Sequence, residues 1–182
     1  MHGIVSLLDD KHDKLVKSVC DELEDQCGLQ GIRETPFPHF SWQVADGYKD
    51  DEIEQTLQEL ADEIEPFEIN VVGVGIFSGN TGGLPVLYVP VLRQQVLNLN
   101  HRLIWKRLEC CAINPKELYH AYNWMPHITL AYGDVTQEKL DCAVKLLCFR
   151  EINWKIPINN ISNVYLVEGE PGKLKYSYEL KG

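Results

Sequence analysis

One short phrase occurs twice in this chain, and it restricts how the chain can fold. The two copies are Pro-His-Phe-Ser-Trp at residues 38–42 and Pro-His-Ile-Thr-Leu at residues 126–130. Successive side chains of a strand point to opposite faces, so His39 is predicted to share a face with Ser41, and His127 with Thr129. The apolar residues between them then enter the core. The fold must therefore turn two imidazole–hydroxyl pairs toward the space between the copies.

The secondary structure predicted around the two copies is duplicated as well. Both halves read strand-helix-strand-helix-strand, with the motif on the middle strand. The predicted strands are Gly3–Leu8, Phe37–Ala45, Phe67–Phe77, Leu84–Val91 and Met125–Tyr132, with three more within Ile152–Ile158, Ile161–Val167 and Leu174–Leu180. The predicted helices are Lys11–Gln26, Asp50–Ile64, Arg93–Cys111 and Gln137–Phe149, and the turn Ser78–Gly83 separates the halves. A duplication of whole elements is a stronger signal than either short motif alone.

The charge of the chain argues against binding long nucleic acids. The 182 residues include 27 acidic and 17 basic side chains, a net charge of −10. Residues 1–91 carry 18 acidic and 5 basic side chains, whereas residues 92–182 carry 9 acidic and 12 basic. Long nucleic acids bind largely by neutralisation of their phosphates, and an acidic surface repels them. The expected partner is a small nucleotide, or the end of an RNA laid on the second half.

The cysteines predict no metal site and no structural staple. They are Cys20, Cys27, Cys110, Cys111, Cys142 and Cys148. None forms a CxxC pair or lies near a histidine at ligand spacing, so we expect reduced thiols, mostly in the core. With no signal-peptide pattern and no apolar run of ~20 residues, we expect a soluble, cytoplasmic protein that does not bind membranes. A monomer is expected.

Two histidines facing one gap suit displacement at phosphorus. Nucleophile and leaving oxygen occupy opposite apices there, so a proton acceptor and a proton donor are needed on opposite sides. Imidazoles fill both roles near neutral pH, and the chemistry needs no metal ion. The glycines Gly73, Gly75 and Gly79 miss the GxGxxG pattern, and no Gly-Lys-Ser/Thr phosphate loop is present. We therefore expect no cofactor.

Taken together, the two motifs resemble those of the two-histidine (2H) phosphoesterase superfamily, in particular its 2′-5′ RNA ligase-like and cyclic nucleotide phosphodiesterase branch. The second motif, His-Ile-Thr-Leu-Ala, has the residues typical of the family. In the first motif Ser41 replaces the commoner threonine and keeps its hydroxyl group. Tyr132 occupies a slot that holds arginine in many bacterial members. The resemblance implies a duplicated α+β fold. We expect one domain over residues 1–182, with pseudo-symmetric lobes of about 1–83 and 84–182. Antiparallel-rich sheets would flank a central cleft, with the helices outside.

The resemblance also implies an activity. It is hydrolysis of a 2′,3′-cyclic phosphate on a nucleotide or an RNA 3′ end. Family analogy makes His127 the base that activates water and His39 the acid, while Ser41 and Thr129 hold the non-bridging oxygens. Reversing the substrate would swap the two histidines. Two alternatives stay open: cleavage of 2′-5′-linked oligonucleotides, and a module that binds a nucleotide without turning it over.

Three aromatic residues are candidates for stacking on a base. They are Phe77, Trp124 and Tyr132. Stacking of a base on an aromatic ring contributes ~1–3 kcal/mol, but Phe77 and Trp124 fit core packing equally well. Trp42 has the opposite strand parity to His39 and is expected in the core. The remaining histidines lack partners at ligand or triad spacing and are expected to be structural: His2, His12, His101 and His120.

Overall fold

The computed structural model describes residues 1–79, 83–167 and 170–182. These residues form an α+β fold, which confirms the predicted class. Their helices are α1 (Asp10–Cys27), α2 (Asp50–Glu63), α3 (Gln95–Leu108) and α4 (Gln137–Leu147), with short 3-10 turns η1 (Gly31–Glu34) and η2 (Glu117–Tyr119). Their strands are β1 (His2–Leu7), β2 (His39–Ala45), β3 (Gly47–Tyr48), β4 (Phe67–Val72), β5 (Gly75–Phe77), β6 (Val86–Pro90), β7 (Ala112–Ile113), β8 (His127–Ala131), β9 (Asn153–Ile158), β10 (Asn160–Tyr165) and β11 (Lys173–Glu179). Part of the predicted turn Ser78–Gly83 lies outside the described residues.

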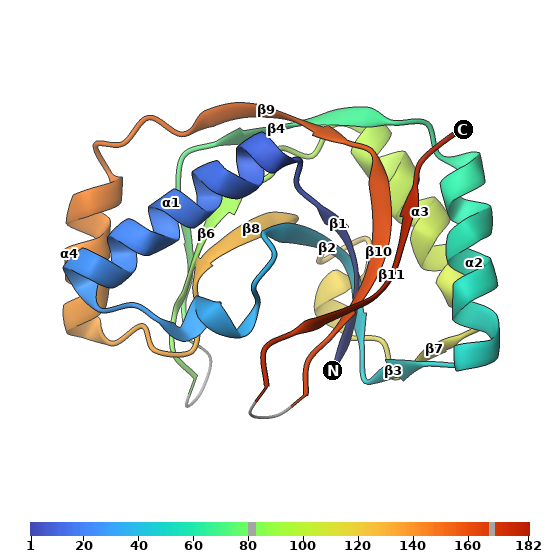
Figure 1. Cartoon of the computed structure of the whole chain (residues 1–182), viewed down its shortest axis with the longest axis horizontal. Coiled ribbons are helices and arrows are strands. Elements are labelled where there is room, and N and C mark those ends of the chain that lie inside the picture. Colours follow the sequence, from blue (N-terminus) through green and yellow to red (C-terminus); the bar gives the residue numbers. More distant parts are fainter. Residues whose placement is uncertain (80–82, 168–169) are drawn as a thin grey trace.

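Most of the described strands join one antiparallel sheet. Its seven strands run in the order β11-β10-β1-β2-β8-β6-β5, while β3 pairs with β7 and β4 with β9. Helices α1 and α4 pack together at one end of the sheet, and α2 and α3 at the other (Figure 1). Strands β10 and β11 come from the second half of the sequence and yet extend the sheet beside β1. Strands from residues 1–83 and 84–182 therefore interleave within one sheet.

Local sequence signals explain where the helices begin and end. The Asp9 carboxylate accepts hydrogen bonds from the backbone N–H groups of Lys11 and His12, which caps the start of α1. Gly28 ends that helix with φ +68°, a left-handed conformation that favours glycine. The Thr136 hydroxyl caps α4 in the same way as Asp9 caps α1. Each helix turns one apolar stripe to the core, such as Ile53, Leu57 and Leu60 of α2.

The two motif strands meet at a single ladder pair. Phe40 of β2 lies opposite Ile128 of β8 in antiparallel register, and both side chains are fully buried. Alternation along each strand therefore places the side chains at 39, 41, 127 and 129 on the other face. The register between β1 and β2 shifts beside this point, so that Trp42 has no partner on β1. This bulge bends β2 at the last residue of the motif.

An aromatic stack fills the core behind the motif strands. Trp42 stacks on Trp124 with ring centroids 5.6 Å apart, and Trp124 stacks on His101 at 3.8 Å. The Nε2–H group of His101 donates to the carbonyls of Trp42 and Tyr119, at 3.2 and 3.0 Å. Trp42 was predicted in the core and is 1% exposed, so that prediction is confirmed. At the bulge, where β2 does not pair with β1, the His101 side chain therefore binds the β2 backbone.

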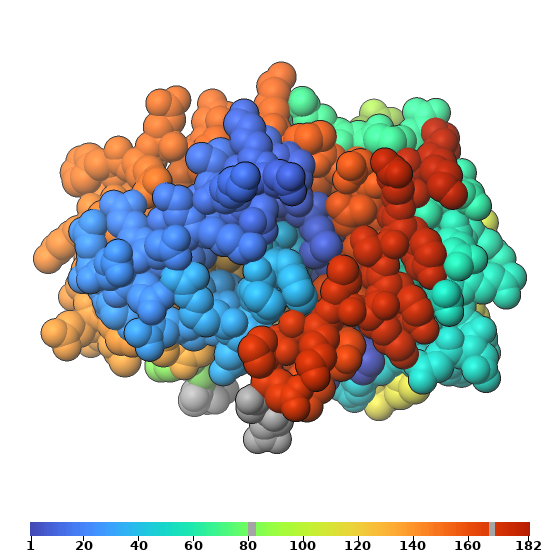
Figure 2. All heavy atoms as spheres, viewed as in Figure 1, coloured from blue at the N-terminus to red at the C-terminus, as the bar shows by residue number. Residues whose placement is uncertain are grey.

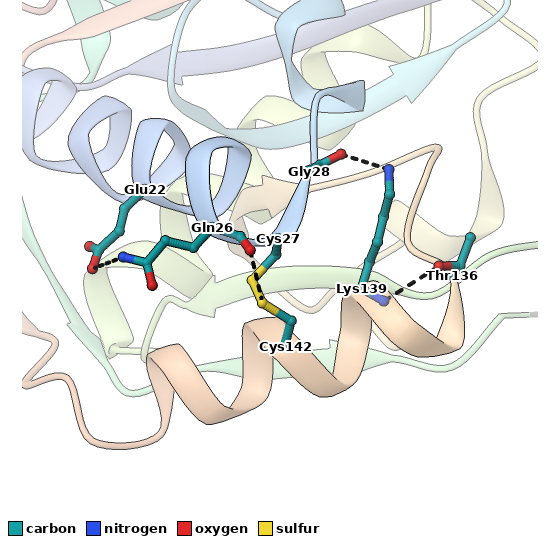
Figure 3. The surroundings of a disulfide bond; sticks show 7 residues. All are labelled: Glu22, Gln26, Cys27, Gly28, Thr136, Lys139 and Cys142. Carbon is teal, nitrogen blue, oxygen red and sulfur yellow. Dashed lines mark hydrogen bonds between the residues drawn. A yellow bond between two sulfur atoms is a disulfide. The ribbon is translucent and has the colours of Figure 1, made fainter.

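The expectation of six reduced cysteines is wrong. Cys27 and Cys142 form a disulfide that joins the end of α1 to α4 across 115 residues of sequence (Figure 3). Beside it, the Lys139 ammonium donates to the Gly28 carbonyl at 2.7 Å. Of the described free cysteines, Cys20 and Cys111 are buried while Cys110 and Cys148 are exposed. The pairing depends on the packing of two helices far apart in sequence, which cysteine spacing does not show.

The loop before β2 is locked to the loop after β8. The backbone N–H of Gln30 donates to the Asp134 carboxylate at 2.9 Å. At Gly31 the backbones approach so closely that an added Cβ would lie 1.8 Å from the Tyr132 carbonyl oxygen. The chain on its way into the first motif is thus fixed to the chain leaving the second.

Replacing Gly31 with Ala tests this lock. The added methyl group overlaps the Tyr132 carbonyl and forces the loops apart, so we expect the free energy of unfolding to fall by about 1–3 kcal/mol. Gly47→Ala is the matched control, because a Cβ there meets its nearest atom at 3.8 Å. Urea unfolding of both variants is the measurement. Equal stability of the two variants would contradict the close approach.

Candidate active site

The site is built from the four side chains that the Phe40–Ile128 pair turns to one face. His39, Ser41, His127 and Thr129 are all partly exposed, whereas the residues between them are buried. Antiparallel register sets His39 opposite Thr129 and Ser41 opposite His127. The structure therefore brings the two motifs into one constellation, with the imidazoles on a diagonal and a hydroxyl beside each.

Both imidazoles are held by the same local hydrogen bond. The Nδ1–H of His39 donates to the Phe37 carbonyl at 2.8 Å, and that of His127 donates to the Met125 carbonyl at 2.6 Å. A carbonyl only accepts, so Nδ1 carries a hydrogen in both rings. In the neutral ring Nε2 then keeps its lone pair. Each histidine thus presents Nε2 as a proton acceptor when neutral and as a proton donor when charged.

The proline of the repeated phrase explains why this bond recurs. Pro38 and Pro126 each stand between a histidine and the carbonyl that it binds. Proline fixes its own φ and holds the residue before it in an extended conformation. In both copies the carbonyl two residues upstream consequently faces the imidazole. The phrase Pro-His encodes the position of the ring and also its tautomer.

Burial favours the neutral form of both rings by lowering their pKa values. Desolvation lowers the pKa of His39 below 6.5, against the opposing effect of the Phe37 carbonyl, and the nearby His127 lowers it further. Desolvation also lowers the pKa of His127, against the effect of the Met125 carbonyl. In the unfolded chain these histidines have a pKa near 6.5, above their pKa values in the folded protein. Their contribution to the free energy of unfolding is therefore fully present above pH 6.5 and is lost as the pH falls through the lower, folded-state pKa values.

Two aromatic rings pack against His127. Phe77 lies edge-on to the imidazole with centroids 4.9 Å apart, and Tyr88 does so at 5.2 Å. The two rings stack on each other at 4.1 Å. Gly75 makes room for this pair, because a Cβ there would lie 2.4 Å from the Tyr88 ring. Phe77 was a candidate from the sequence, but Tyr88 was not. Tyr88 lies on the same side of the sheet as His127 because it pairs with Thr129 of β8, and the sequence alone does not show that pairing.

Two other sequence candidates lie away from the imidazoles. Trp124 is 1% exposed, so it cannot stack on a base and that prediction is wrong. Its indole N–H donates to the Ser41 carbonyl at 2.9 Å, which makes it a support for β2. Tyr132 is half exposed and follows β8 with the opposite parity to Thr129. Its backbone carbonyl lies against Gly31, the first residue of η1.

The described residues include no group of three or more His, Cys, Asp or Glu side chains that could hold a metal ion. The histidines outside the motifs have structural partners. Nδ1 of His12 lies 2.6 Å from the capping carboxylate of Asp9. Burial lowers the pKa of His101 to about 4, so it remains a neutral member of the core stack.

Comparison with protein families agrees with this geometry. Residues 12–138 match the model of the 2′-5′ RNA ligase superfamily, and this span contains both motifs. The chain belongs to this superfamily. It is the 2H phosphoesterase family that the motifs resemble, so the protein is a member of a family of phosphoesterases. No curated protein sequence matches the chain.

Solved structures share the 2H phosphoesterase fold with this chain. The protein TT0787 of Thermus thermophilus superposes with a TM-score of 0.65 at 17% sequence identity. LigT of E. coli, complexed with 3′-AMP, gives 0.62 at 11%, and a structure described as a phosphoesterase gives 0.60 at 12%. In all three comparisons the match covers 100% of this chain and 98% of the other. At these identities the likeness shows the fold alone. None of the described helices is long and apolar enough to cross a membrane.

The hydrogen bonds of the two imidazoles in this 2H phosphoesterase predict their tautomers, which NMR can measure. Nitrogen-resolved NMR should show both rings protonated at Nδ1 when neutral, with pKa values below 6.5. In His127→Gln the pKa of His39 should rise, because one neighbouring charge is removed. It should stay below 6.5, because burial is the larger cause. His120→Gln is the control and should leave His39 unchanged. Protonation at Nε2 in the neutral rings would refute the assigned geometry.

Proposed function

We propose that the protein hydrolyses a 2′,3′-cyclic phosphate on a small nucleotide or an RNA end, without a metal ion. The observation that carries the proposal is the matched pair of Nδ1–carbonyl hydrogen bonds. They leave two Nε2 atoms, one on each motif strand, for a phosphate between them. A base and an acid that differ only in protonation state are what opening of a cyclic diester requires.

The reaction follows from these groups. One neutral imidazole accepts a proton through Nε2 from a water molecule as its oxygen attacks phosphorus. The bond from phosphorus to one ribose oxygen breaks, and the other imidazole, entering protonated, donates its Nε2 proton to that oxygen. The product is a phosphate monoester with a free neighbouring hydroxyl. The Ser41 and Thr129 hydroxyls lie beside the rings and supply donors to the non-bridging oxygens.

The lowered pKa values fit this division of labour. Burial lowers the pKa of both rings below 6.5 and so favours their neutral form near pH 7, in which each can act as a base. An anionic phosphate favours the charged form of an imidazole beside it and raises its pKa. Binding of substrate therefore favours the uptake, from water, of the proton that the acid later donates. Family analogy assigns the base to His127 and the acid to His39.

The substrate class has support from a structural neighbour. LigT of E. coli was captured with 3′-AMP, a ribonucleotide with a phosphate on the ribose. A cyclic phosphate on the same ribose is the diester related to such a monoester. The half-buried ring of Phe77, stacked on the buried Tyr88 and edge-on to His127, provides an apolar surface for a second nucleoside. Cleavage of a 2′-5′ linkage, with a ribose hydroxyl as nucleophile, is the competing activity that this surface favours.

Turnover of adenosine 2′,3′-cyclic phosphate tests the proposal directly. His39→Ala and His127→Ala should each lower kcat/KM by roughly 10²–10⁴-fold, because each removes one proton-transfer partner. The double variant should be little worse than the poorer single one, since both rings act in one displacement. His120→Ala, outside the motifs, is the control and should retain activity. A folded His127→Ala variant within a few-fold of the wild type would refute the mechanism, and faster cleavage of 2′-5′-linked diadenylate would favour the competing activity.

The hydroxyl groups should matter less than the imidazoles. Ser41→Ala and Thr129→Ala each remove one hydrogen bond to charged oxygens, worth ~1.5–3 kcal/mol, so we expect losses of roughly 10- to 100-fold in kcat/KM. Val144→Ala, on the exposed face of α4, is the control. Losses as large as those of the histidine variants would contradict a role limited to one hydrogen bond each.

The pH profile should be bell-shaped with its maximum below 6.5. The profile of kcat/KM reports the pKa values of base and acid in the free enzyme, and burial lowers both. Activity rises as the base loses its proton and falls as the acid loses its own, so the maximum lies between two lowered values. Turnover should also persist in EDTA. Loss of activity on chelation, with recovery on adding one divalent metal, would point to metal-assisted hydrolysis.

A further inference from the structure

A cavity of about 270 Å³ lies beside one of the two imidazoles. His39 and Thr129 form part of its wall, so it is continuous with the candidate active site. The rest of the wall comes from α1, from η1 and from the loop that leads into β2. Drug-sized ligand pockets usually measure about 300–1,000 Å³. This cavity therefore suits one ring system and not a run of nucleotides.

The positive charges of the wall are paired with carboxylates that lie next to it. It includes two cations, Lys17 and Arg33, and carboxylates of α1 already bind both. Lys17 pairs with Asp13 at 2.9 Å. Arg33 donates to Asp21 at 2.6 Å and to Glu24 at 2.8 Å. Three carboxylates of α1, just outside the wall, thus neutralise its two cations and leave no surplus positive charge to attract a phosphate.

The remaining wall is apolar and uncharged. Val16 and Ile32 line it from α1 and η1, and Phe37 with its flanking prolines lines it from the loop. Burial raises the pKa of the Cys20 thiol, also in the wall, to about 11, so the thiol stays neutral. Apolar walls with a few polar groups are typical of sites for flat heterocycles. An uncharged ring is the occupant that this surface accepts.

The two imidazoles differ in what surrounds them. Phe77 and Tyr88 pack directly against the His127 ring, whereas the cavity adjoins His39. A bound nucleotide with its ring in the cavity therefore places its ribose on the His39 side. We propose that the cavity holds the base of the nucleoside whose ribose carries the cyclic phosphate. This inference rests on the proposed function and gives the pseudo-symmetric site one direction of binding.

The cavity wall is fixed before a ligand arrives. The segment that forms it begins at the Cys27–Cys142 disulfide and is held by Gln30 to the Asp134 carboxylate. On its other side, the backbone N–H of Gly172 donates to the Glu34 carbonyl at 2.6 Å. The start of β11 lies beside this segment on the surface (Figure 2, red beside light blue). A preorganised wall spends little binding energy on ordering. The base can therefore contribute to affinity.

The test compares two substrates in a cavity-filling variant. The substrates are adenosine 2′,3′-cyclic phosphate and 1-O-methylribose 2,3-cyclic phosphate, which lacks the base. The wild type should prefer the nucleotide by roughly 10- to 100-fold in kcat/KM, as expected for one base held against a protein surface. Thr35 is half-buried in the cavity wall, so Thr35→Trp should fill the cavity with the indole ring. The ratio of kcat/KM for the two substrates should then be close to one. Val144→Trp, exposed on α4, is the matched control and should leave the ratio unchanged.

Each outcome separates this inference from the proposed function. If the preference for the nucleotide persists in Thr35→Trp, the cavity is not the base site. The same conclusion follows if the wild type turns over both substrates equally well. In either case the proposed hydrolysis of a cyclic phosphate still stands. If Thr35→Trp fails to fold, Pro36→Trp places the ring from an exposed position of the same wall. If the wild type turns over neither substrate, the proposed function fails. Calorimetry with adenosine 2′-monophosphate and its baseless analogue then decides: tighter binding of the nucleotide, lost in Thr35→Trp, supports the cavity, and equal binding overturns it.

Discussion

The pairing of Phe40 with Ile128 is the contact on which the site depends. It is the only ladder pair between β2 and β8 in the described residues, and through it the two motif strands share one sheet. Burying two apolar side chains on one face obliges their neighbours to occupy the other. A hydrophobic contact thereby sets the spacing of the polar groups. Slippage by one residue on either strand would turn its histidine into the core.

The chemistry of the site comes from the backbone as much as from the side chains. Two carbonyls, of Phe37 and Met125, select the tautomer of the imidazoles, and the prolines of the repeated phrase hold those carbonyls in place. No carboxylate is needed to orient either ring. A carboxylate partner would favour the charged imidazole and raise its pKa. A carbonyl orients the ring with less effect, so burial can keep both rings neutral until an anion arrives.

Features that are periodic along the chain could be predicted from its sequence. The four helices and the motif strands follow from apolar spacing, and strand parity correctly separated His39 from Trp42. Features that join distant segments could not. The disulfide between Cys27 and Cys142 depends on how two helices pack. Trp124 has no alternation to assign it, because it lies in a loop before β8, and only the folded core shows that its indole supports β2.

The order of strands in the sheet has a consequence for synthesis of the chain. Strand β1 is made long before one of its two neighbours, β10, which spans Asn160–Tyr165. Until β10 emerges from the ribosome, one row of β1 backbone groups faces water or another chain. Contacts between residues so far apart in sequence form slowly, and unpaired strand edges favour aggregation. The sheet therefore cannot be completed until β10 has been made, and a chaperone that shields the nascent chain would protect the unpaired edge of β1 until then.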